Sequence, residues 1–263
     1  MAAVGAELQA VIAIAEQAGR HLMARFRTGL AGRPKGRHSF VCEADESAER
    51  LVRAALAERF PGEPVLGEEF GLAGRPARAW WAVDPLDGTT NFLGGLPLFC
   101  VSLARIVEGQ AVLGAIHQPA SGETWAAARG GGAWLGGRRL RIEQTDLGAR
   151  AIVGITHGLV RRAPAGAVRA LGTDKLRCLG SVALELAYAA CSRLQAVATR
   201  HVHLWDVAAG ALLVEEAGGL VRTLEGRPLF PLAGGPEQWL ERRLGLLAGA
   251  PAMVERLGAA LGR

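Results

Sequence analysis

The segment with the clearest chemical potential is an apolar run, residues 79–83, that leads into two closely spaced carboxylates, Asp84 and Asp87. Pro85 between them cannot donate to a sheet, so we expect a strand to end where the carboxylates begin. The carbonyl of Leu86 is then free to bind a ligand. Two crowded carboxylates repel, and one would hold a proton unless a cation neutralised both. Oxygen ligands of this kind suit Mg²⁺, so the segment predicts a magnesium site.

Gly88 and Thr89 follow directly and predict a turn and a helix start. Backbone N–H groups at such a position can hold a phosphate. The alternative interpretation is an ordinary turn, because Asp, Pro and Gly occur in turns of any protein.

Three further segments could complete the same site. Glu68 follows a short apolar run and could join the cation cluster, although an exposed Glu-Glu loop is equally natural. Asp206 opens an apolar helix, where it could also be a plain N-cap. Gly180 and Ser181 lie in a strand-to-helix turn and could face a ligand or merely start the helix.

The elements that must position these groups change character along the chain. The first half combines two helices with a meander of strands, and the second half alternates strands and helices, which is typical of a helix-flanked sheet. We therefore expect an α+β fold whose N-terminal half, 1–147, and C-terminal half, 148–263, form one compact unit. Helices are predicted over 1–26, from an Asp45 cap to Pro61-Gly62, over 182–192 and 207–217, and from 252 onward; strands are predicted over 79–83, 98–105, 112–118, 125–129, 151–156, 175–178 and 244–248, with a hairpin over 133–142 about Gly136-Gly137.

Composition narrows the class of protein. The 263 residues are half apolar and carry a formal charge of +5, but the basic residues are spread along the chain, as on a solvated surface, so a nucleic-acid partner is not expected. No apolar run is long enough to span a membrane, and polar residues interrupt the first helix, so we expect a cytoplasmic protein without a membrane partner. The four cysteines are widely separated and are expected to be buried thiols.

Taken together, these segments resemble the inositol monophosphatase family. Gly67-Glu68-Glu69, the stretch 84–92 and the stretch 205–210 match its three ordered motifs, and 44–49, 130–140 and 215–219 also match, so the resemblance covers nearly the whole chain. It implies a layered αβαβα sugar-phosphatase-type fold, magnesium-dependent hydrolysis of a small polar phosphate ester, and a homodimer.

The resemblance also implies a role for each motif residue. Two or three Mg²⁺ ions would be held by Glu68, Asp84, the Leu86 carbonyl, Asp87 and Asp206, with Asp84 shared between two of them. Two cations about 4 Å apart can stabilise both the entering and the leaving oxygen of the phosphoryl group. Glu68 and Thr89 would hold the attacking water, and Asp45 would support Thr89 through a hydrogen bond.

Substrate contacts follow by the same analogy. The phosphate would lie on the backbone of Gly88 and Thr89, beside Asp87, and the loop around Lys35 within 29–38 would be either a flap over the metals or an uninvolved surface loop. The alcohol part would contact Gly180, Ser181 and Val182.

Two positions depart from the family pattern. Cys42 replaces a usual threonine, and Thr199 stands seven residues before Asp206, where inositol-handling members have a glutamate. A carboxylate that would bind the hydroxyls of a sugar-like alcohol is missing at this substrate-side position, Thr199, which argues against myo-inositol monophosphate as the preferred substrate. His201 and His203 could contact the substrate instead, or could lie on one face of a strand without any ligand.

Several functions thus remain open. Histidinol phosphate, a 3′(2′),5′-bisphosphate nucleotide and fructose bisphosphate are alternative substrates, and a pI near 9.5 motivates a non-enzymatic scaffold that contacts RNA or a transcription complex. The motifs of P-loop, dinucleotide-binding, zinc-protease and serine-hydrolase sites are absent from the sequence.

Overall fold

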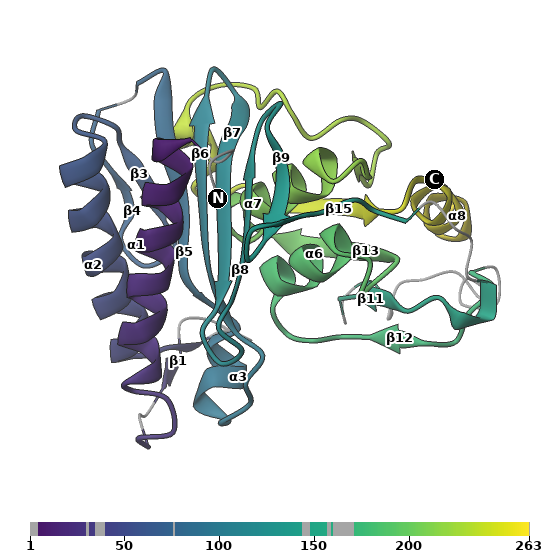
Figure 1. Ribbon diagram of the computed structural model, residues 1–263, viewed down its shortest axis with the longest axis horizontal. Coiled ribbons are helices and arrows are strands. Elements are labelled where there is room, and N and C mark those ends of the chain that lie inside the picture. Colours follow the sequence, from purple (N-terminus) through teal and green to yellow (C-terminus); the bar gives the residue numbers. More distant parts are fainter. Residues whose placement is uncertain are drawn as a thin grey trace.

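The computed structural model describes residues 5–29, 32–34, 40–75, 77–143, 148–156, 159 and 171–262. Helices α1 (Ala6–Met23) and α2 (Glu43–Arg59) cover one face of an eight-stranded sheet (Figure 1). Helices α6 (Val182–Ala190) and α7 (Leu204–Glu216) lie between this sheet and a five-stranded one, whose outer side carries α8 (Pro251–Ala260). The five layers confirm the expected αβαβα fold.

The eight-stranded sheet has the order β10-β9-β8-β7-β6-β5-β3-β4. All neighbours are antiparallel except β3 and β5, which are parallel. β6 and β7 are buried on both faces because α1 covers one side and α7 the other. The strands are β3 (Val65–Gly67), β4 (Gly71–Ala73), β5 (Ala79–Asp87), β6 (Cys100–Val107), β7 (Gln110–Gln118), β8 (Glu123–Ala128), β9 (Gly132–Leu135) and β10 (Arg138–Arg139).

The five-stranded sheet has the order β12-β11-β13-β15-β14, with β11 parallel to both of its neighbours. Its strands are β11 (Val153–Ile155), β12 (Leu176–Arg177), β13 (Ala196–Val202), β14 (Leu220–Thr223) and β15 (Leu244–Gly249). The remaining described elements are short: β1 (Arg33–Pro34) paired with β2 (Phe40–Val41), α3 (Thr89–Leu93), η1 (Gly148–Arg150) and η2 (Pro236–Trp239). The first sheet thus uses strands before residue 140 and the second uses strands after 152, so the division that we propose at 147/148 falls between them.

The strand that carries the paired carboxylates is longer than predicted. β5 does not end at Asp84 but continues through Pro85 to Asp87, with a register shift against β6 between the two aspartates. Proline is tolerated there because β3 pairs with β5 only as far as Val83. Beyond Val83 no N–H of β5 is needed for a hydrogen bond to β3, so the missing N–H of Pro85 costs nothing on the β3 side.

The start of α2 also differs from the prediction. Cys42 is the N-cap and Asp45 is the third helical residue, so the helix begins three residues earlier than a cap at Asp45 would require. One Asp45 oxygen accepts the Cys42 N–H at 2.9 Å, which is the reciprocal half of a capping box.

No strand was predicted for β14, and one was raised for the β13 region only as an alternative for His201 and His203. In β13 the polar residues Arg200 and His201 interrupt the apolar pattern, and the structure accommodates them with a bulge at which His201 has a φ of +62° and is exposed. β14 is a four-residue strand at the sheet edge, too short for its periodicity to be distinctive.

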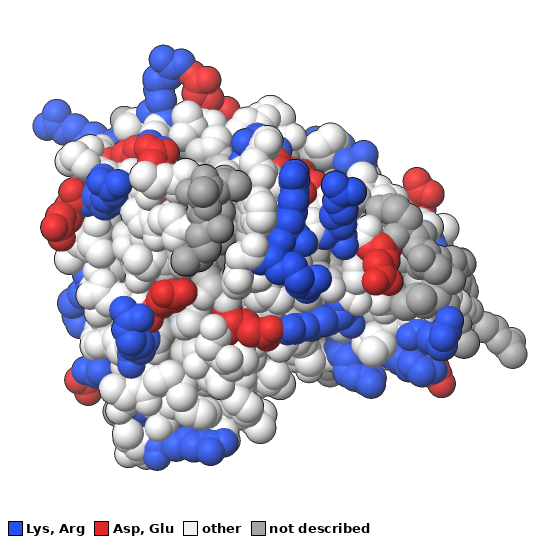
Figure 2. Space-filling model, in the orientation of Figure 1, with Lys and Arg blue, Asp and Glu red and all other residues white. Residues whose placement is uncertain are grey.

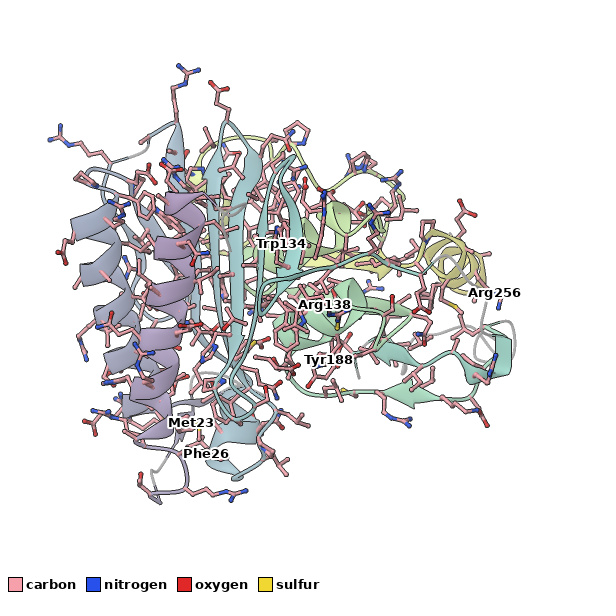
Figure 3. All side chains as sticks on the ribbon, viewed as in Figure 1. Met23, Phe26, Trp134, Arg138, Tyr188 and Arg256 are labelled. Carbon is pink, nitrogen blue, oxygen red and sulfur yellow. The ribbon has the colours of Figure 1, made fainter. Side chains whose placement is uncertain are left out.

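Aromatic packing fixes α3 against the end of α1. Phe26, just beyond α1, lies with its ring centroid 5.5 Å from that of Phe92 and 4.9 Å from that of Phe99 (Figure 3). The helix that follows the carboxylate motif is therefore held by an aromatic contact with a half-buried residue more than 60 positions away in the chain.

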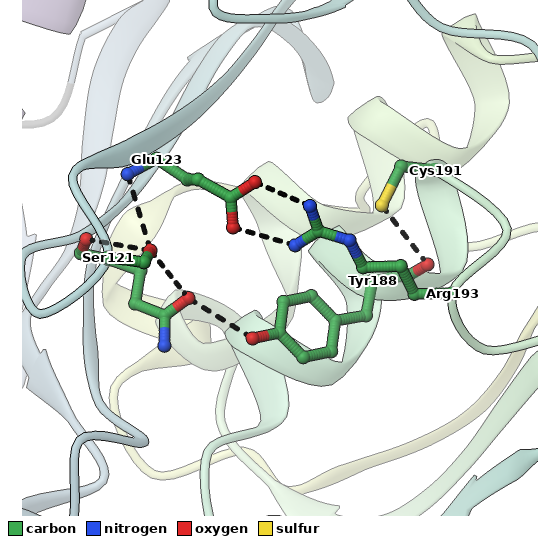
Figure 4. A network of polar contacts seen from close by, with 6 residues as sticks. Ser121, Glu123, Tyr188, Cys191 and Arg193 are labelled. Carbon is green, nitrogen blue, oxygen red and sulfur yellow. Dashed lines mark hydrogen bonds and ion pairs between the residues drawn. The ribbon is translucent and has the colours of Figure 1, made fainter.

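A polar network joins the two halves next to α6. Arg193 donates to both oxygens of Glu123, at 2.7 and 2.5 Å, and the Tyr188 hydroxyl donates to Gln118 at 3.1 Å (Figure 4). These bonds link the β7–β8 turn of the first sheet to the end of α6.

The surface is consistent with the expected spread of charge. On the face in Figure 2, basic side chains are distributed over both halves with acidic ones between them. No helix within the described residues is long and apolar enough to cross a membrane. Cys42 and Cys100 are buried, but Cys178 is exposed beside the edge strand β12, so the expectation of four buried thiols is wrong.

Candidate active site

Three carboxylates from different elements converge at one edge of the eight-stranded sheet. Glu68 follows β3, Asp84 lies in β5 and Asp206 lies in the first turn of α7, and one oxygen of each lies within 4.8 Å of the others. Because β3 and β5 are parallel, their carboxyl ends meet at the same edge. The Glu68 N–H donates to the Val83 carbonyl at 3.2 Å, which places Glu68 beside Asp84.

Burial, followed by mutual crowding with the charges of neighbouring acids, raises the pKa values of two of these carboxylates, Asp84 and Asp206, well above the ordinary range. Burial likewise raises the pKa of Asp87 to about 7. A divalent cation would offset this repulsion, and the donors are the hard oxygens that Mg²⁺ prefers. The residues present therefore fit a magnesium site.

Asp206 and Asp87 also hold the helices that adjoin the site. Asp206 is not a plain N-cap, because the N-cap of α7 is His203, whose N–H donates to Asp206 at 2.7 Å. One Asp87 oxygen accepts from the Ser181 hydroxyl at 2.8 Å and from the Ala183 N–H at 2.6 Å, which ties β5 to the start of α6.

Thr89 and Asp45 form a hydrogen-bonded pair behind the carboxylates. The Thr89 hydroxyl lies 2.7 Å from an Asp45 oxygen and 3.1 Å from the Leu86 carbonyl. A hydroxyl can donate only one hydrogen bond, and the closer acceptor, the Asp45 carboxylate, receives it. The Leu86 carbonyl oxygen is therefore available to another ligand. Asp45 is 1 % exposed, and burial raises its pKa above the ordinary value.

Two glycines allow the backbone to approach the site closely. Gly88 has a φ of +97°, and a Cβ there would lie 2.8 Å from the Leu98 carbonyl oxygen. Gly180 has a φ of +77°, and a Cβ there would lie 2.9 Å from the amide of Asn91. That amide donates to the Leu179 carbonyl at 2.7 Å and so fixes the Gly180 turn against α3.

The carboxylates, Thr89 and the two glycines line a cavity of about 430 Å³. The sequence analysis did not assign Thr90, Trp205, Leu240 or Arg243 to it, and it left His203 undecided. The His203 and Trp205 rings stack with their centroids 4.2 Å apart, and Trp205 could have been anticipated from its place next to Asp206. The described lining consists of Glu68, Asp84, Leu86, Asp87, Gly88, Thr89, Thr90, Gly180, His203, Trp205, Asp206, Leu240 and Arg243.

Four residues with predicted roles do not line the described cavity. Asp45 lies behind Thr89, and Ser181 is buried against Asp87. Val182 is half-buried at the start of α6. Thr199 is fully buried in β13, where its hydroxyl has no hydrogen-bond partner among the described residues. Lys35 lies outside the described residues.

Glu185 is a buried acid near the site that the sequence analysis did not consider. It is 1 % exposed in the first turn of α6, and one oxygen accepts the Leu179 N–H at 2.6 Å. The second oxygen has no partner among the described residues. Burial raises the pKa of Glu185 to about 7.

Replacing Glu185 by glutamine should change the pH dependence of stability. Between the ordinary pKa of 4.5 and about 7, the folded protein keeps a proton that the unfolded chain has lost, so the free energy of unfolding of the wild type falls as the pH rises. Glu185→Gln carries no charge and should be more stable than the wild type at pH 8, by up to about 3 kcal/mol. Urea unfolding in a chelator should show this gain shrinking as the pH falls toward 4.5; a gain independent of pH would contradict it.

Comparison with known proteins agrees with the geometry. The profile of the inositol monophosphatase family matches residues 6–253. An inositol-1-monophosphatase of Mesorhizobium japonicum is 39 % identical over 83 % of this chain and 86 % of its own length. A protein of Xylella fastidiosa named Nus factor SuhB is 40 % identical over 73 % of this chain and 72 % of its own.

The similarity extends to three dimensions. The crystal structure of extragenic suppressor protein suhB from Bartonella henselae superposes with a TM-score of 0.86 at 31 % identity, covering 98 % of this chain and 99 % of that one. The shared fold, the ordered motifs and the acidic cluster lead to one conclusion: this chain belongs to the inositol monophosphatase family.

Proposed function

We propose that the protein is a Mg²⁺-dependent phosphomonoesterase, similar to inositol-1-monophosphatase, that hydrolyses a small polar phosphate ester. The observation that carries this proposal is the convergence of Glu68, Asp84 and Asp206 within 4.8 Å, beside the Thr89–Asp45 pair. In this proposal two or three ions are held by Glu68, Asp84, the Leu86 carbonyl, Asp87 and Asp206. Bound magnesium would neutralise the phosphate and lower the pKa of the attacking water.

The side chains around the cluster have distinct tasks in this scheme. The Thr89 hydroxyl donates its hydrogen bond to Asp45, so a lone pair of that hydroxyl can accept a hydrogen bond from the water. Glu68 accepts a hydrogen bond from the other O–H of the same water and thereby fixes the direction of attack. The phosphate lies on the backbone of Gly88 and Thr89, and Gly180 adjoins the alcohol part.

Removing the metal should abolish the activity reversibly. Dialysis against a chelator should leave less than about 1 % of the phosphate release, because a metal contributes several kcal/mol of charge stabilisation. Added Mg²⁺ should restore it, and far-ultraviolet circular dichroism should be unchanged throughout. Full activity of protein shown to be metal-free would contradict the proposal.

The cavity favours an ester whose alcohol part carries a second negative group. The glutamate expected at Thr199 is absent, and Arg243 is the only arginine or lysine among the described residues that line the cavity. The Arg243 guanidinium donates to the His201 carbonyl at 3.3 Å, which holds it on the Asp206 side of the cavity. Fructose bisphosphate and the bisphosphate nucleotide satisfy this requirement better than histidinol phosphate, whose amine is cationic.

A substrate panel tests this preference. Phosphate release should be measured from inositol monophosphate, histidinol phosphate, fructose bisphosphate and the bisphosphate nucleotide. A bisphosphate should have a kcat/KM at least about tenfold above that of inositol monophosphate, which corresponds to one charge-assisted hydrogen bond. Arg243→Gln should remove that advantage while keeping the weaker activities. A preference for inositol monophosphate would refute the role given to Arg243.

The name of the Xylella relative supports a second candidate function, a scaffold for a transcription complex. RNA retention that weakens with salt, in a protein without magnesium-dependent phosphate release, would favour this function. We place it second because the proposed metal ligands Glu68, Asp84, Asp87 and Asp206 are all present. A cytoplasmic location and a homodimer stay predictions.

A further inference from the structure

Helix α2 directs three polar side chains, each one helical turn from the next, toward the loops of the proposed site. Asp45, Glu49 and Arg53 are spaced four residues apart and therefore share one face of the helix. Glu49 is 0 % exposed, which is unusual for a carboxylate, and burial of such a group is tolerated only when it is paired and hydrogen-bonded.

Glu49 holds the loop that carries Glu68. One of its oxygens accepts the Glu69 N–H at 2.7 Å, and the other lies 3.3 Å from the Phe70 N–H. The residues directly after Glu68 are thus fixed through their backbone. Gly67, directly before it, leaves room for this approach, because a Cβ there would lie 2.2 Å from a Glu49 oxygen.

Arg53 also hydrogen-bonds the β3–β4 hairpin that contains this loop. Its Nε donates to Glu49 at 2.7 Å, and its two terminal nitrogens donate to the Val65 carbonyl at 3.1 Å and to the Gly71 carbonyl at 2.6 Å. These carbonyls lie on β3 and β4, so a single guanidinium spans the hairpin on both sides of the loop. A lysine ammonium could not serve three acceptors in this fork geometry.

One turn earlier on the same face, Asp45 holds Thr89. Thr89 follows β5, whereas Glu68 follows β3. Side chains of α2 therefore hydrogen-bond the segments that follow both strands at the site. We propose that Glu49 and Arg53 are positioning residues for Glu68, and that α2 thereby sets the separation between Glu68 and Thr89. This inference rests on the proposed function, since it assigns the metal and the water to those two side chains.

The test separates metal affinity from turnover. Glu49→Gln removes the charge that holds the loop and should raise the Mg²⁺ concentration for half-maximal thermal stabilisation by about tenfold or more. Mn²⁺ binding followed by electron paramagnetic resonance should weaken equally, which gives a readout independent of activity. Arg53→Lys should produce a smaller shift in the same direction. Asp45→Asn, at the Thr89 end, should lower kcat without changing the Mg²⁺ requirement.

Val52→Ala is the matched control, because it removes buried methyl groups from the same helix without touching a polar group at the loop. It should lower the Tm but leave the Mg²⁺ midpoint at its wild-type value. If Glu49→Gln behaves like Val52→Ala, with a lower Tm and an unchanged Mg²⁺ midpoint, the positioning role is overturned. A wild-type protein that binds neither Mg²⁺ nor Mn²⁺ would instead overturn the proposed function itself.

Discussion

Asp84→Asn is expected to lower phosphate release by at least about a thousandfold, because it removes a charge central to the proposed cation site, and such a site supplies several kcal/mol to the reaction. Asparagine has nearly the same shape, and its side-chain oxygen can still accept the Leu86 N–H that Asp84 accepts at 2.9 Å. The fold should therefore persist. Steady-state assays over a range of Mg²⁺ concentrations would measure the effect.

Stability measurements provide the control for this variant. Without metal, Asp84→Asn should be at least as stable as the wild type, since it removes one of the crowded carboxylates around Glu68 and Asp206. With metal, it should lose most of the Mg²⁺-dependent rise in Tm. Wild-type activity in the variant, or a full Mg²⁺-dependent Tm rise, would defeat the assignment of Asp84 as a shared ligand.

Thr89→Ala should lower kcat by about a hundredfold or more, the usual contribution of a group that positions a proton transfer. The Mg²⁺ requirement should change little, because the hydroxyl is assigned to the water and not to the metal. Pre-steady-state and steady-state release of phosphate, measured at saturating Mg²⁺, would check the result.

The variant Asp45→Asn, combined with Thr89→Ala, shows whether Asp45 and Thr89 act on the same step or independently. Because Asp45 reaches the site through the Thr89 hydroxyl, the double variant should be no slower than Thr89→Ala alone. Additive losses would mean that Asp45 acts on the substrate by another route, in disagreement with the 2.7 Å contact.

The sequence was most informative where ligands are close together in the chain. Asp84, Leu86 and Asp87 follow one another at the end of an apolar run, so their proximity needed no knowledge of the fold. Glu68 could be added because it also follows a short apolar run, and the parallel pairing of β3 with β5 then places both strand ends at one edge.

Other site residues could not be predicted, because their positions depend on long-range packing. Arg243 precedes β15 and reaches the cavity only because β15 pairs with β13, which leads into α7. Glu49 entered the sequence analysis only as part of the stretch 44–49 that matches the family, without a role of its own. Its contacts with Glu69 and Phe70 require the β3–β4 hairpin to fold over α2, which local periodicity does not specify.

Helix α7, buried between the two sheets, carries Asp206, whereas the other acids of the cluster belong to the first sheet. In the proposed function, an ion held by these carboxylates would connect α7 to the first sheet, so its affinity should depend on how the two layers pack. Cavity-creating substitutions in the core-facing side of α7, far from any reacting atom, should lower the metal affinity, and larger cavities should lower it more. Conversely, tighter packing around that helix offers a route to a phosphatase that keeps its metals at higher temperature.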